Sequence, residues 1–440
     1  MQKDEKLLDK IVSLAKRRGF VFQGSEIYGG FAGMWDYGPY GVALKNNIKN
    51  LWWKMFVDAR DDVWGIDAAI LMPARVWDAS GHTGAGFTDP LVECAECKKR
   101  FRADHLEDKK KCPECGGMLG EERQFNLMFE TRVGALEDSS AVSYLRPETA
   151  QGIFVNFKNV VDSVHPKLPF GIAQVGKAFR NEITPRDFIF RIRELEQMEI
   201  EYFVKPTDWE RVFEEWREAT GKWIDALGID RAHVREVEIG DGDRAHYSKR
   251  TIDFEYEYPF GTKELSGLAY RTDYDLSNHT KHSGQDLGYF DEERKERLVP
   301  HVIEPSFGVE RALLAVLCDA YREEEVNGET RVYLKLPTRL APVKVMVSPL
   351  LKNKPELVAK AREVREAVRK VIPETAWDDN GNVGKRYRRQ DEIGTPYCVT
   401  VDFDSLEKGD VTVRDRDTME QVRVPISDLP TYLKEKIEAK

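Results

Sequence analysis

The stretch AFRNEITPRDFIFRIRELEQMEIEYFV, residues 178–204, decides the fold of this chain. Two segments with strand character flank the loop TPRDF, which contains Pro185. Arg180 and Glu182 are two residues apart, so in an extended chain they point to the same face. Charges are rare on a buried sheet unless they are paired or bind a ligand. Arginines that face a cleft suit a polyphosphate, because guanidinium groups bind phosphate oxygens in bidentate fashion.

The alternative for this stretch is a solvated antiparallel hairpin held by salt bridges. Four polar residues of its second flank also share one side: Arg191, Arg193, Gln197 and Glu199. Several apolar neighbours stand between the charges, namely Phe179, Phe190, Ile192, Met198 and Ile200. These residues indicate that the sheet is largely covered, which favours the ligand-binding interpretation.

Length and composition predict a soluble globular protein. The 440 residues are enough for two or three domains with substantial cores, and 33% of them are charged. We expect no membrane partner, because no segment approaches the apolar length of a membrane span. Residues 1–20 predict an amphipathic helix whose acids argue against a targeting peptide. The net charge of −10 argues against global capture of nucleic acid but allows a local basic patch.

Two cysteine pairs give a specific spacing signal. Cys94 and Cys97 form one C-x-x-C pair, and Cys112 and Cys115 form a second one after 14 intervening residues. This spacing lets four thiolates converge tetrahedrally, as in a zinc ribbon. Two disulfides are the weaker alternative, because a chain without a secretion signal fits a reducing compartment. We predict a structural Zn²⁺ in a ribbon-like insertion over residues 93–117, and a cytoplasmic location.

Residues 178–204 closely resemble motif 2 of the class II aminoacyl-tRNA synthetases. Within this stretch, the sequence FRNEITPR followed by EQMEIEYF is similar to the motif 2 sequences of the glycyl branch of that family. Other segments resemble the same family in the same order. They are residues 25–56 (motif 1), LRPETAQGIF at residues 145–154 (the glycyl branch) and HVIEPSFGVERALLAVLC at residues 301–318 (motif 3). The resemblance therefore extends over nearly the whole chain.

The resemblance implies an α+β fold with two domains. Residues 1–340 would form an antiparallel-sheet class II catalytic domain, and residues 341–440 an α/β anticodon-binding domain. A composition shift near residues 337–342, followed by alternating strand and helix patterns, indicates the same division. Relatives of this kind dimerise through the motif 1 region, so a homodimer is implied. A basic cluster in the second domain is either an RNA contact or a solvated charge run: Lys385, Arg386, Tyr387, Arg388 and Arg389.

The function implied by the resemblance is ATP-dependent activation of glycine and its transfer to tRNA(Gly), with Mg²⁺ beside the phosphates. Arg180 and Arg311 would be catalytic, Arg180 on the α-phosphate and Arg311, with Arg191, on the outer phosphates. Glu264 would hold magnesium and Glu182 the adenine amino group. A glycine carboxylate is already ionised, so this chemistry needs positioning and charge stabilisation rather than a general base.

The resemblance implies two sets of binding residues. The ATP set is Arg180, Asn181, Glu182, Phe190, Arg191, Ile192, Arg193, Glu194, Leu195, Glu264, Leu265, Gly308, Val309, Glu310 and Arg311. The glycine set is Arg100, Glu148, Leu195, Glu196, Gln197, Met198, Glu199, Glu304, Pro305, Ser306, Phe307 and Gly308. Leu195 replaces the family's usual aromatic residue, so either the adenine stacks more weakly on that face or Phe190 helps to stack it.

Several of these residues can also be explained by a purely structural role. Each glutamate can be a salt-bridge partner of a nearby arginine, and Glu148 can be a helix-dipole partner in the first turn of a helix that starts at Pro147. His82 lies in a glycine-rich stretch, residues 80–90, and we interpret it as an ordinary loop histidine.

Two other functions compete with the glycyl one. The first is a prolyl or threonyl synthetase, which shares the C-terminal domain type; the glycyl-like sequence around Glu148, residues 197–199 and EPSFG argues against it. The second is a non-catalytic class II synthetase-like nucleic-acid-binding accessory protein. Such a protein would lack the motif arginines, and Arg180 and Arg311 are both present.

Overall fold

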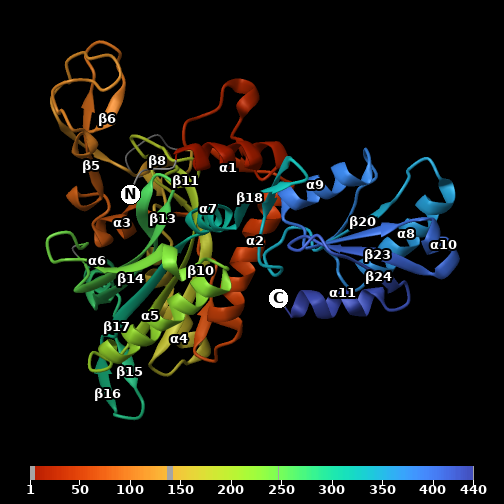
Figure 1. Ribbon diagram of the computed structural model, residues 1–440. Helices are drawn as coiled ribbons and strands as arrows, with labels where there is room; N and C mark the ends of the chain where they lie inside the picture. Colours follow the sequence, from red (N-terminus) through yellow and green to blue (C-terminus); the bar gives the residue numbers. More distant parts are fainter. Residues whose placement is uncertain (1–4, 136–141, 246, 440) are drawn as a thin grey trace.

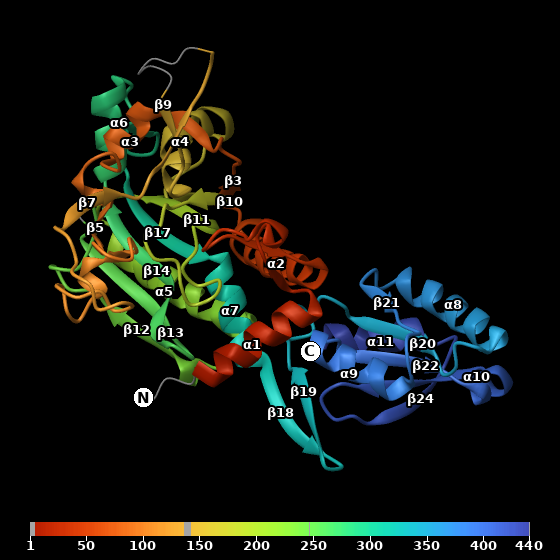
Figure 2. The ribbon, with the colours of Figure 1, turned by 90° about the horizontal axis from the view of Figure 1, so that it is seen from above.

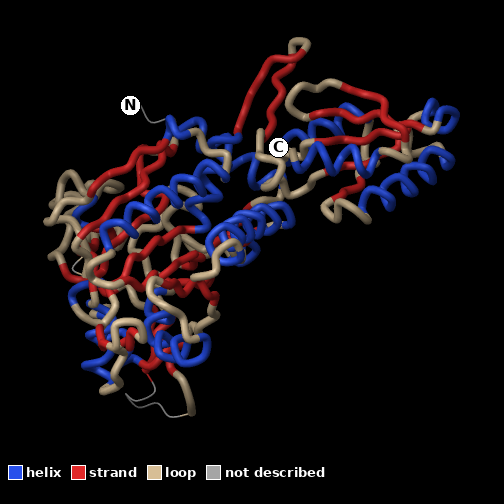
Figure 3. The backbone as a smooth tube through the Cα atoms, turned by 90° about the horizontal axis from the view of Figure 1, so that it is seen from below, coloured by secondary structure: helices blue, strands red, loops and turns tan. Residues whose placement is uncertain are grey.

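The computed structural model describes residues 5–135, 142–245 and 247–439. It contains a larger part built on a long antiparallel sheet and a smaller α/β part at the C-terminal end (Figure 1). The predicted N-terminal helix is α1 (Glu5–Arg18), and residues 1–4 of that prediction lie outside the described residues. Figure 3 shows how strands and helices alternate in space in both parts.

A seven-stranded sheet organises the larger part. Its strands, in order across the sheet, are β12 (Val234–Glu238), β13 (Arg250–Tyr258), β14 (Gly261–Thr272), β17 (His301–Gly308), β11 (Glu194–Val204), β10 (Phe170–Phe179) and β3 (Val63–Gly65). All neighbours are antiparallel except β10 and β3. Residues 178–204 supply the whole of β11 and the last two residues of β10. The α+β prediction is confirmed.

Strand alternation gives this sheet two different faces. Met198, Ile200 and Phe307 are buried in a core on one face. Trp52 and Trp223 complete that core, with ring centroids 6.0 and 4.8 Å from Phe307. The helices that cover this face are α2 (Pro39–Trp53), α5 (Trp209–Ala226) and α7 (Val309–Ala320). Each fully buried aromatic side chain contributes about 1.5–3 kcal/mol to folding.

The opposite face of the sheet is apolar at one end and polar at the other. Phe154, Phe157, Phe170 and Phe203 form the apolar end, where α4 (Ala150–Val164) packs. The polar end carries the acidic residues described below, beside α6 (Tyr274–Ser283). Because side chains alternate, residues 199, 201 and 203 of β11 share this face, and the strand passes from glutamates to phenylalanine along it.

Shorter strands form small sheets around the main one. The first three-stranded sheet is β6 (Arg100–Arg102), β5 (Thr88–Glu93) and β7 (Arg123–Asn126). The second is β4 (Leu71–Pro73), β9 (Val142–Leu145) and β8 (Phe129–Arg132), with α3 (Ala74–Ser80) following β4. The two-stranded ones are β1 (Val21–Gln23) with β2 (Trp35–Tyr37), β15 (Tyr289–Asp291) with β16 (Glu296–Leu298), and β18 (Tyr321–Val326) with β19 (Glu329–Leu334).

The smaller part is a five-stranded sheet with its own core. Its strand order is β21 (Thr375–Trp377), β20 (Val345–Pro349), β22 (Tyr397–Val401), β23 (Asp410–Asp415) and β24 (Gln421–Pro425). The first three strands are parallel and the last two antiparallel. Its helices, visible in Figure 2, are α8 (Pro355–Arg369), α9 (Val383–Ile393), α10 (Phe403–Lys408) and α11 (Leu429–Glu438). The predicted α/β character is confirmed.

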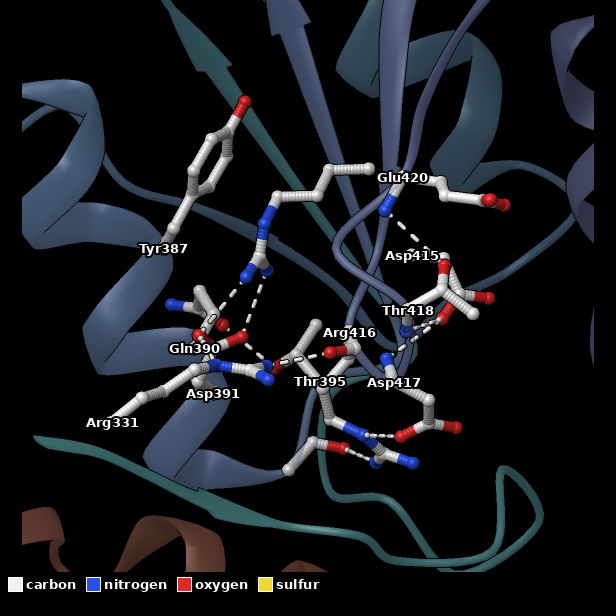
Figure 4. Close-up of polar contacts among 12 residues, drawn as sticks. Arg331, Tyr387, Gln390, Asp391, Thr395, Asp415, Arg416, Asp417, Thr418 and Glu420 are labelled. Carbon is white, nitrogen blue, oxygen red and sulfur yellow. Dashed lines mark hydrogen bonds and ion pairs between the residues drawn. The ribbon is translucent and has the colours of Figure 1, made fainter. Parts of the chain in front are cut away.

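A cluster of ionic contacts joins the two parts (Figure 4). Asp391 on α9 accepts hydrogen bonds from Arg331 on β19, at 2.8 Å, and from Arg414 on β23, at 2.8 and 3.1 Å. Arg416 donates to the carbonyl oxygens of Gly394 and Leu336. Every charge in this cluster has a partner, so it acts as a structural joint between β19 and the C-terminal sheet.

The basic cluster lies on α9, where Arg386 is buried, Lys385 is exposed and the other three side chains are half-buried. Arg386 is 1% exposed and donates to the carbonyl oxygens of Pro349, Asp379 and Gly381. The hydroxyl of Tyr387 is 2.7 Å from Thr400 Oγ1, and its ring faces Arg414. Arg389 pairs with Asp378 at 2.8 Å. The prediction that these residues meet RNA was wrong for Arg386, because a buried guanidinium bound to carbonyls holds the fold together.

Some predicted boundaries also move. Residues 180–182 and 191–193 lie in the loop between β10 and β11 rather than on strands. Helix α4 begins at Ala150, three residues after Pro147, so Glu148 precedes the helix instead of lying in its first turn. No helix of the described ranges is long and apolar enough to cross a membrane.

Candidate active site

A cavity of about 470 Å³ opens on the polar end of the main sheet. Its walls come from the β10–β11 loop, β11, β13, β14, β17 and the start of α7. Fifteen of the residues predicted to bind ATP or glycine line it: Glu148, Arg180, Glu182, Phe190, Arg191, Ile192, Leu195, Gln197, Glu199, Glu264, Glu304, Ser306, Gly308, Glu310 and Arg311. Residues far apart in the chain therefore converge on one cavity.

The cationic end of the cavity holds Arg180, Arg191 and Arg311. Arg180 is fixed by a hydrogen bond from its Nε to the Pro147 carbonyl oxygen, at 3.0 Å. Arg311, in the first turn of α7, lies 2.8 Å from Glu264 Oε2 and 4.7 Å from the centre of the Phe190 ring. The Arg311 charge holds the pKa of Glu264 below its ordinary value. This carboxylate offsets the cost of an arginine at a helix N-terminus.

Two buried polar atoms in this end have no hydrogen-bond partner among the described residues. They are Nη1 of Arg191 and Oε2 of Glu182. Burial lowers the pKa of Arg191, with the Glu182 charge acting in the opposite direction. A buried donor or acceptor without a partner costs about 1–3 kcal/mol. A bound ligand with complementary atoms would remove that cost, so the cationic end is built to receive one.

The acidic end of the cavity is formed by Glu148, Glu199 and Glu304. Glu199 accepts hydrogen bonds from Thr149 Oγ1 at 2.5 Å and from Ser306 Oγ at 3.1 Å. Glu304 accepts one from Arg271 at 2.7 Å. These acids stand on neighbouring strands or next to them, because Glu199 pairs with Ser306 across β11 and β17.

Their electrostatics differ. Burial would raise the pKa of Glu148, but His82 and Arg271 outweigh it and hold that pKa well below the ordinary range. Burial raises the pKa of Glu304 to about 8; the Arg271 charge opposes this shift, and the charges of Glu199 and Glu148 add to it. Burial and Glu148 also raise the pKa of Glu199. The acidic end therefore has more carboxyl groups than cationic partners, and an ammonium group would add positive charge there.

Several predicted residues lie away from the cavity because of strand alternation. Met198, Leu265, Pro305 and Phe307 are buried on the other face of their strands, while Val309 is buried at the start of helix α7. Glu194 pairs with Lys177, and Glu196 with Lys45 and Lys49. The predicted runs included these positions only because they adjoin lining residues in sequence.

Three more predicted residues support the site or stand outside it. The Arg193 guanidinium donates to the carbonyl oxygens of Ala32 and Glu182, which ties the β10–β11 loop to the β1–β2 connection. The backbone N–H of Asn181 donates a hydrogen bond to the Leu127 carbonyl oxygen. Arg100 lies on β6, where its exposed side chain pairs with Glu93 at 2.8 Å. The structure thus places Arg100 in the cysteine-bearing insertion, and Arg102 lines the cavity.

Sequence reasoning missed several residues of the site. Asp253 lines the cavity from β13 near Glu264, and Arg271, the residue before the last one of β14, contacts Asp275 and Glu304. His82 is only 8% exposed and lies 3.3 Å from Glu148, so it is a buried partner of a cavity carboxylate rather than an ordinary loop histidine. The alternation of β13 and the sequence RTDYDL were the signals available for Asp253 and Arg271.

The four cysteines of the two C-x-x-C pairs come together beside β5. Sγ of Cys94 is 3.5 Å from that of Cys115, and Sγ of Cys97 is 3.7 Å from that of Cys112. All four sulfurs lie within 4.8 Å of one another and none is in a disulfide. Four sulfurs around one tetrahedral zinc, each at about 2.3 Å, stand at such separations. The donor set therefore fits Zn²⁺.

Comparison with known proteins agrees with this geometry. Residues 134–320 match the family described as tRNA synthetase class II core domain (G, H, P, S and T), and residues 344–436 match the anticodon binding domain. The chain is 52% identical to the glycine–tRNA ligase of Caldanaerobacter subterraneus, over 98% of both chains. It is 53% identical to that of Clostridium acetobutylicum, over 99% of this chain and 100% of the relative. The chain therefore belongs to the glycine–tRNA ligase family of the class II aminoacyl-tRNA synthetases.

Proposed function

We propose that this chain activates glycine with ATP and transfers the glycyl group to tRNA(Gly). One observation carries the proposal: a single cavity has guanidinium groups at one end and an excess of buried carboxylates at the other. The cationic end suits a triphosphate, and the acidic end suits the ammonium group of an amino acid. Glycine places its carboxylate between the two ends.

The residues act in the first step by positioning and charge stabilisation. A carboxylate oxygen of glycine attacks the α-phosphorus of ATP, the bond to the β-phosphate oxygen breaks, and pyrophosphate leaves. Arg180 neutralises the charge that develops on the α-phosphate, while Arg191 and Arg311 hold the outer phosphates. Glu182 accepts from the adenine amino group with its buried Oε2, and Phe190 and Leu195 border the base.

Glycine selection rests on the acidic end. Glu148, Glu199 and Glu304 receive the ammonium group, and Ser306 stands next to Glu199 at the position nearest the α-carbon. Every competing amino acid is larger, so a rigid wall can exclude it without an editing domain.

Two metal ions belong to the proposal. Glu264, faced by Asp253, would hold Mg²⁺, which neutralises phosphate charge when ATP is bound. The cysteine quartet Cys94, Cys97, Cys112 and Cys115 would hold a structural Zn²⁺. Protein purified without chelator should contain about one zinc per chain, and Cys112→Ser should remove it. Zinc-free wild-type protein would defeat that assignment.

The remaining proposals concern the domain roles, the oligomeric state and the cellular location of the protein. We assign residues 1–340 to catalysis and 341–440 to anticodon binding, because Leu340 packs in the larger core and Val345 in the smaller one. A homodimer through α2 and the free edge of β3 fits the motif 1 region, and thiols arranged for zinc fit the cytoplasm. Sedimentation should give twice the monomer mass.

Pyrophosphate exchange, scanned across the twenty amino acids, tests the function. Exchange should require glycine, and alanine or serine should support it only weakly. Comparable activation of alanine would contradict the proposed glycine pocket. A complete lack of exchange would favour the non-catalytic accessory protein, against which the pocket arginines argue.

A further inference from the structure

Glu201 is a buried acid that the proposed mechanism does not use. It follows Glu199 by two residues on β11, so both side chains lie on the polar face of the sheet. Glu201 is 0% exposed and does not line the cavity, whereas Glu199 and Glu304 do. One carboxylate oxygen of each of these three residues lies within 4.8 Å of the other two. Glu201 therefore stands directly behind the acidic wall.

Neither oxygen of Glu201 has a hydrogen-bond partner within the part of the chain that the structure describes. The nearby positive and polar groups are committed elsewhere. Arg271 bonds Asp275 through Nε and Nη2 and Glu304 through Nη1. Thr149 and Ser306 bond Glu199. On α6, His279 bonds Gln151, and Gln151 bonds Asp275 and Glu148. An ionised Glu201 would therefore have no hydrogen bond to the nearby Arg271 and would lie beside two further carboxyl groups.

We propose that Glu201 is kept as a neutral carboxylic acid, and that it acts as a positioning residue which holds Glu199 and Glu304 in place for the glycine ammonium group. This inference rests on the proposed function. A neutral acid can donate one hydrogen bond to a neighbouring carboxylate, and an ion in its place would repel both. Burial and the charges of Glu304, Glu199 and Asp275 raise the pKa of Glu201 well above the ordinary value, against the pull of Arg271.

The arrangement has a physical purpose. Two carboxylates are needed to bind an ammonium group tightly, but their repulsion would spread them when the cavity is empty. The hydrogen bond that a neutral Glu201 donates from behind the wall restrains the carboxylate that accepts it without filling the cavity. Glu148, restrained by His82, closes the same wall from the segment before α4. Glu201 thus influences the fit of the ammonium group without touching it.

The test compares three variants by glycine KM and kcat in pyrophosphate exchange. Glu201→Gln keeps the shape, neutrality and a donor, so its KM should stay within about twofold of wild type. Glu201→Leu removes the donor and should raise KM by several-fold with little change in kcat. Glu199→Gln removes a charge that meets the ammonium, and should raise KM by about tenfold or more. Equal losses in Glu201→Gln and Glu199→Gln would overturn the proposal, because Glu201 would then be an ammonium ligand.

A second measurement needs no activity and separates this inference from the proposed function. Folding that retains a proton on Glu201 makes stability fall as pH rises from the ordinary glutamate pKa towards the raised one. Glu201→Gln removes that loss, so its gain in Tm over wild type should grow between about pH 5 and about pH 9. Glu215→Gln, on the exposed side of α5, should give no such trend.

Three outcomes would overturn the inference even if glycine activation is confirmed. One is a Tm difference between Glu201→Gln and wild type that does not change with pH. Another is a Glu201→Leu variant with wild-type glycine KM. The third is a metal ion, other than zinc, that wild type binds and Glu201→Gln loses. A wild-type enzyme that fails to activate glycine would reject the proposed function, while the Tm series would still decide the state of Glu201.

Discussion

The Asp391 cluster and the acidic end of the cavity are both buried and charged, yet they are built in opposite ways. Asp391 receives hydrogen bonds on both oxygens from Arg331 and Arg414, and these guanidinium groups are almost fully buried. The acidic end brings Glu199, Glu201 and Glu304 together, with Arg271 bonding only one of the three. Complete pairing marks a structural joint, and missing counter-charge marks a site that awaits a ligand.

The largest effect should come from breaking the paired cluster. Asp391→Ala leaves two buried guanidinium groups without their shared anion, which should lower the free energy of unfolding by about 3–5 kcal/mol. Denaturant titration measures this loss. Asp404→Ala breaks the exposed pair with Lys408 and should cost less than about 1 kcal/mol. If both changes cost the same, the cluster is not a joint. Glycine KM of folded Asp391→Ala should remain that of wild type.

The cationic end should respond in rate rather than in stability. Arg180→Ala removes a preorganised donor at the α-phosphate, and should slow adenylate formation by about 10²–10³-fold. Single-turnover measurement of adenylate formation gives the rate. Arg100→Ala is the matched control, because Arg100 pairs with Glu93 outside the cavity and its loss should change the rate little. Near-normal rates for a folded Arg180→Ala would remove this residue from the mechanism.

The acidic end should respond in substrate affinity. Glu199→Gln weakens one charged contact to the ammonium group, worth about 1.5–3 kcal/mol, so glycine KM should rise by about 10–100-fold. The ATP KM should stay near its wild-type value. Glu194→Gln, on the same strand but paired with half-exposed Lys177, should leave both constants unchanged. A similar rise in the ATP KM would mean that Glu199 organises the whole cavity rather than the ammonium site.

The sequence predicted the fold well because its signals are local in character. The strand pattern of residues 178–204 predicts β10 and β11, and the cysteine spacing predicts the sulfur cluster. The binding residues were predicted as continuous stretches of sequence. Such a stretch includes both faces of a strand, so it also took in core residues such as Met198 and Phe307. Asp253 and Arg271 escaped because their roles depend on neighbours across the sheet. The internal use of Arg386 was hidden for the same reason, since its partners come from other segments.

Asp253 offers the smallest and most selective test of the comparison, because it is an acid that borders the cationic end of the cavity. Burial and the charges of Glu264 and Glu255 raise the pKa of Asp253 to about 7, although Arg311 opposes them. The folded chain therefore holds a proton that the unfolded chain releases, and wild type loses stability as pH rises from the ordinary aspartate range to about 7. Asp253→Asn removes this loss, so its gain in Tm should be larger at about pH 8 than at about pH 5.

Added Mg²⁺ should stabilise wild type more than the Asp253→Asn variant, since a carboxylate near Glu264 would bind the ion. The effect should be smaller than the others because Asp253 borders the cavity and is partly solvated. A pH-independent Tm difference, with equal response to Mg²⁺, would place Asp253 with the paired charges of the Asp391 cluster instead of with the ligand site.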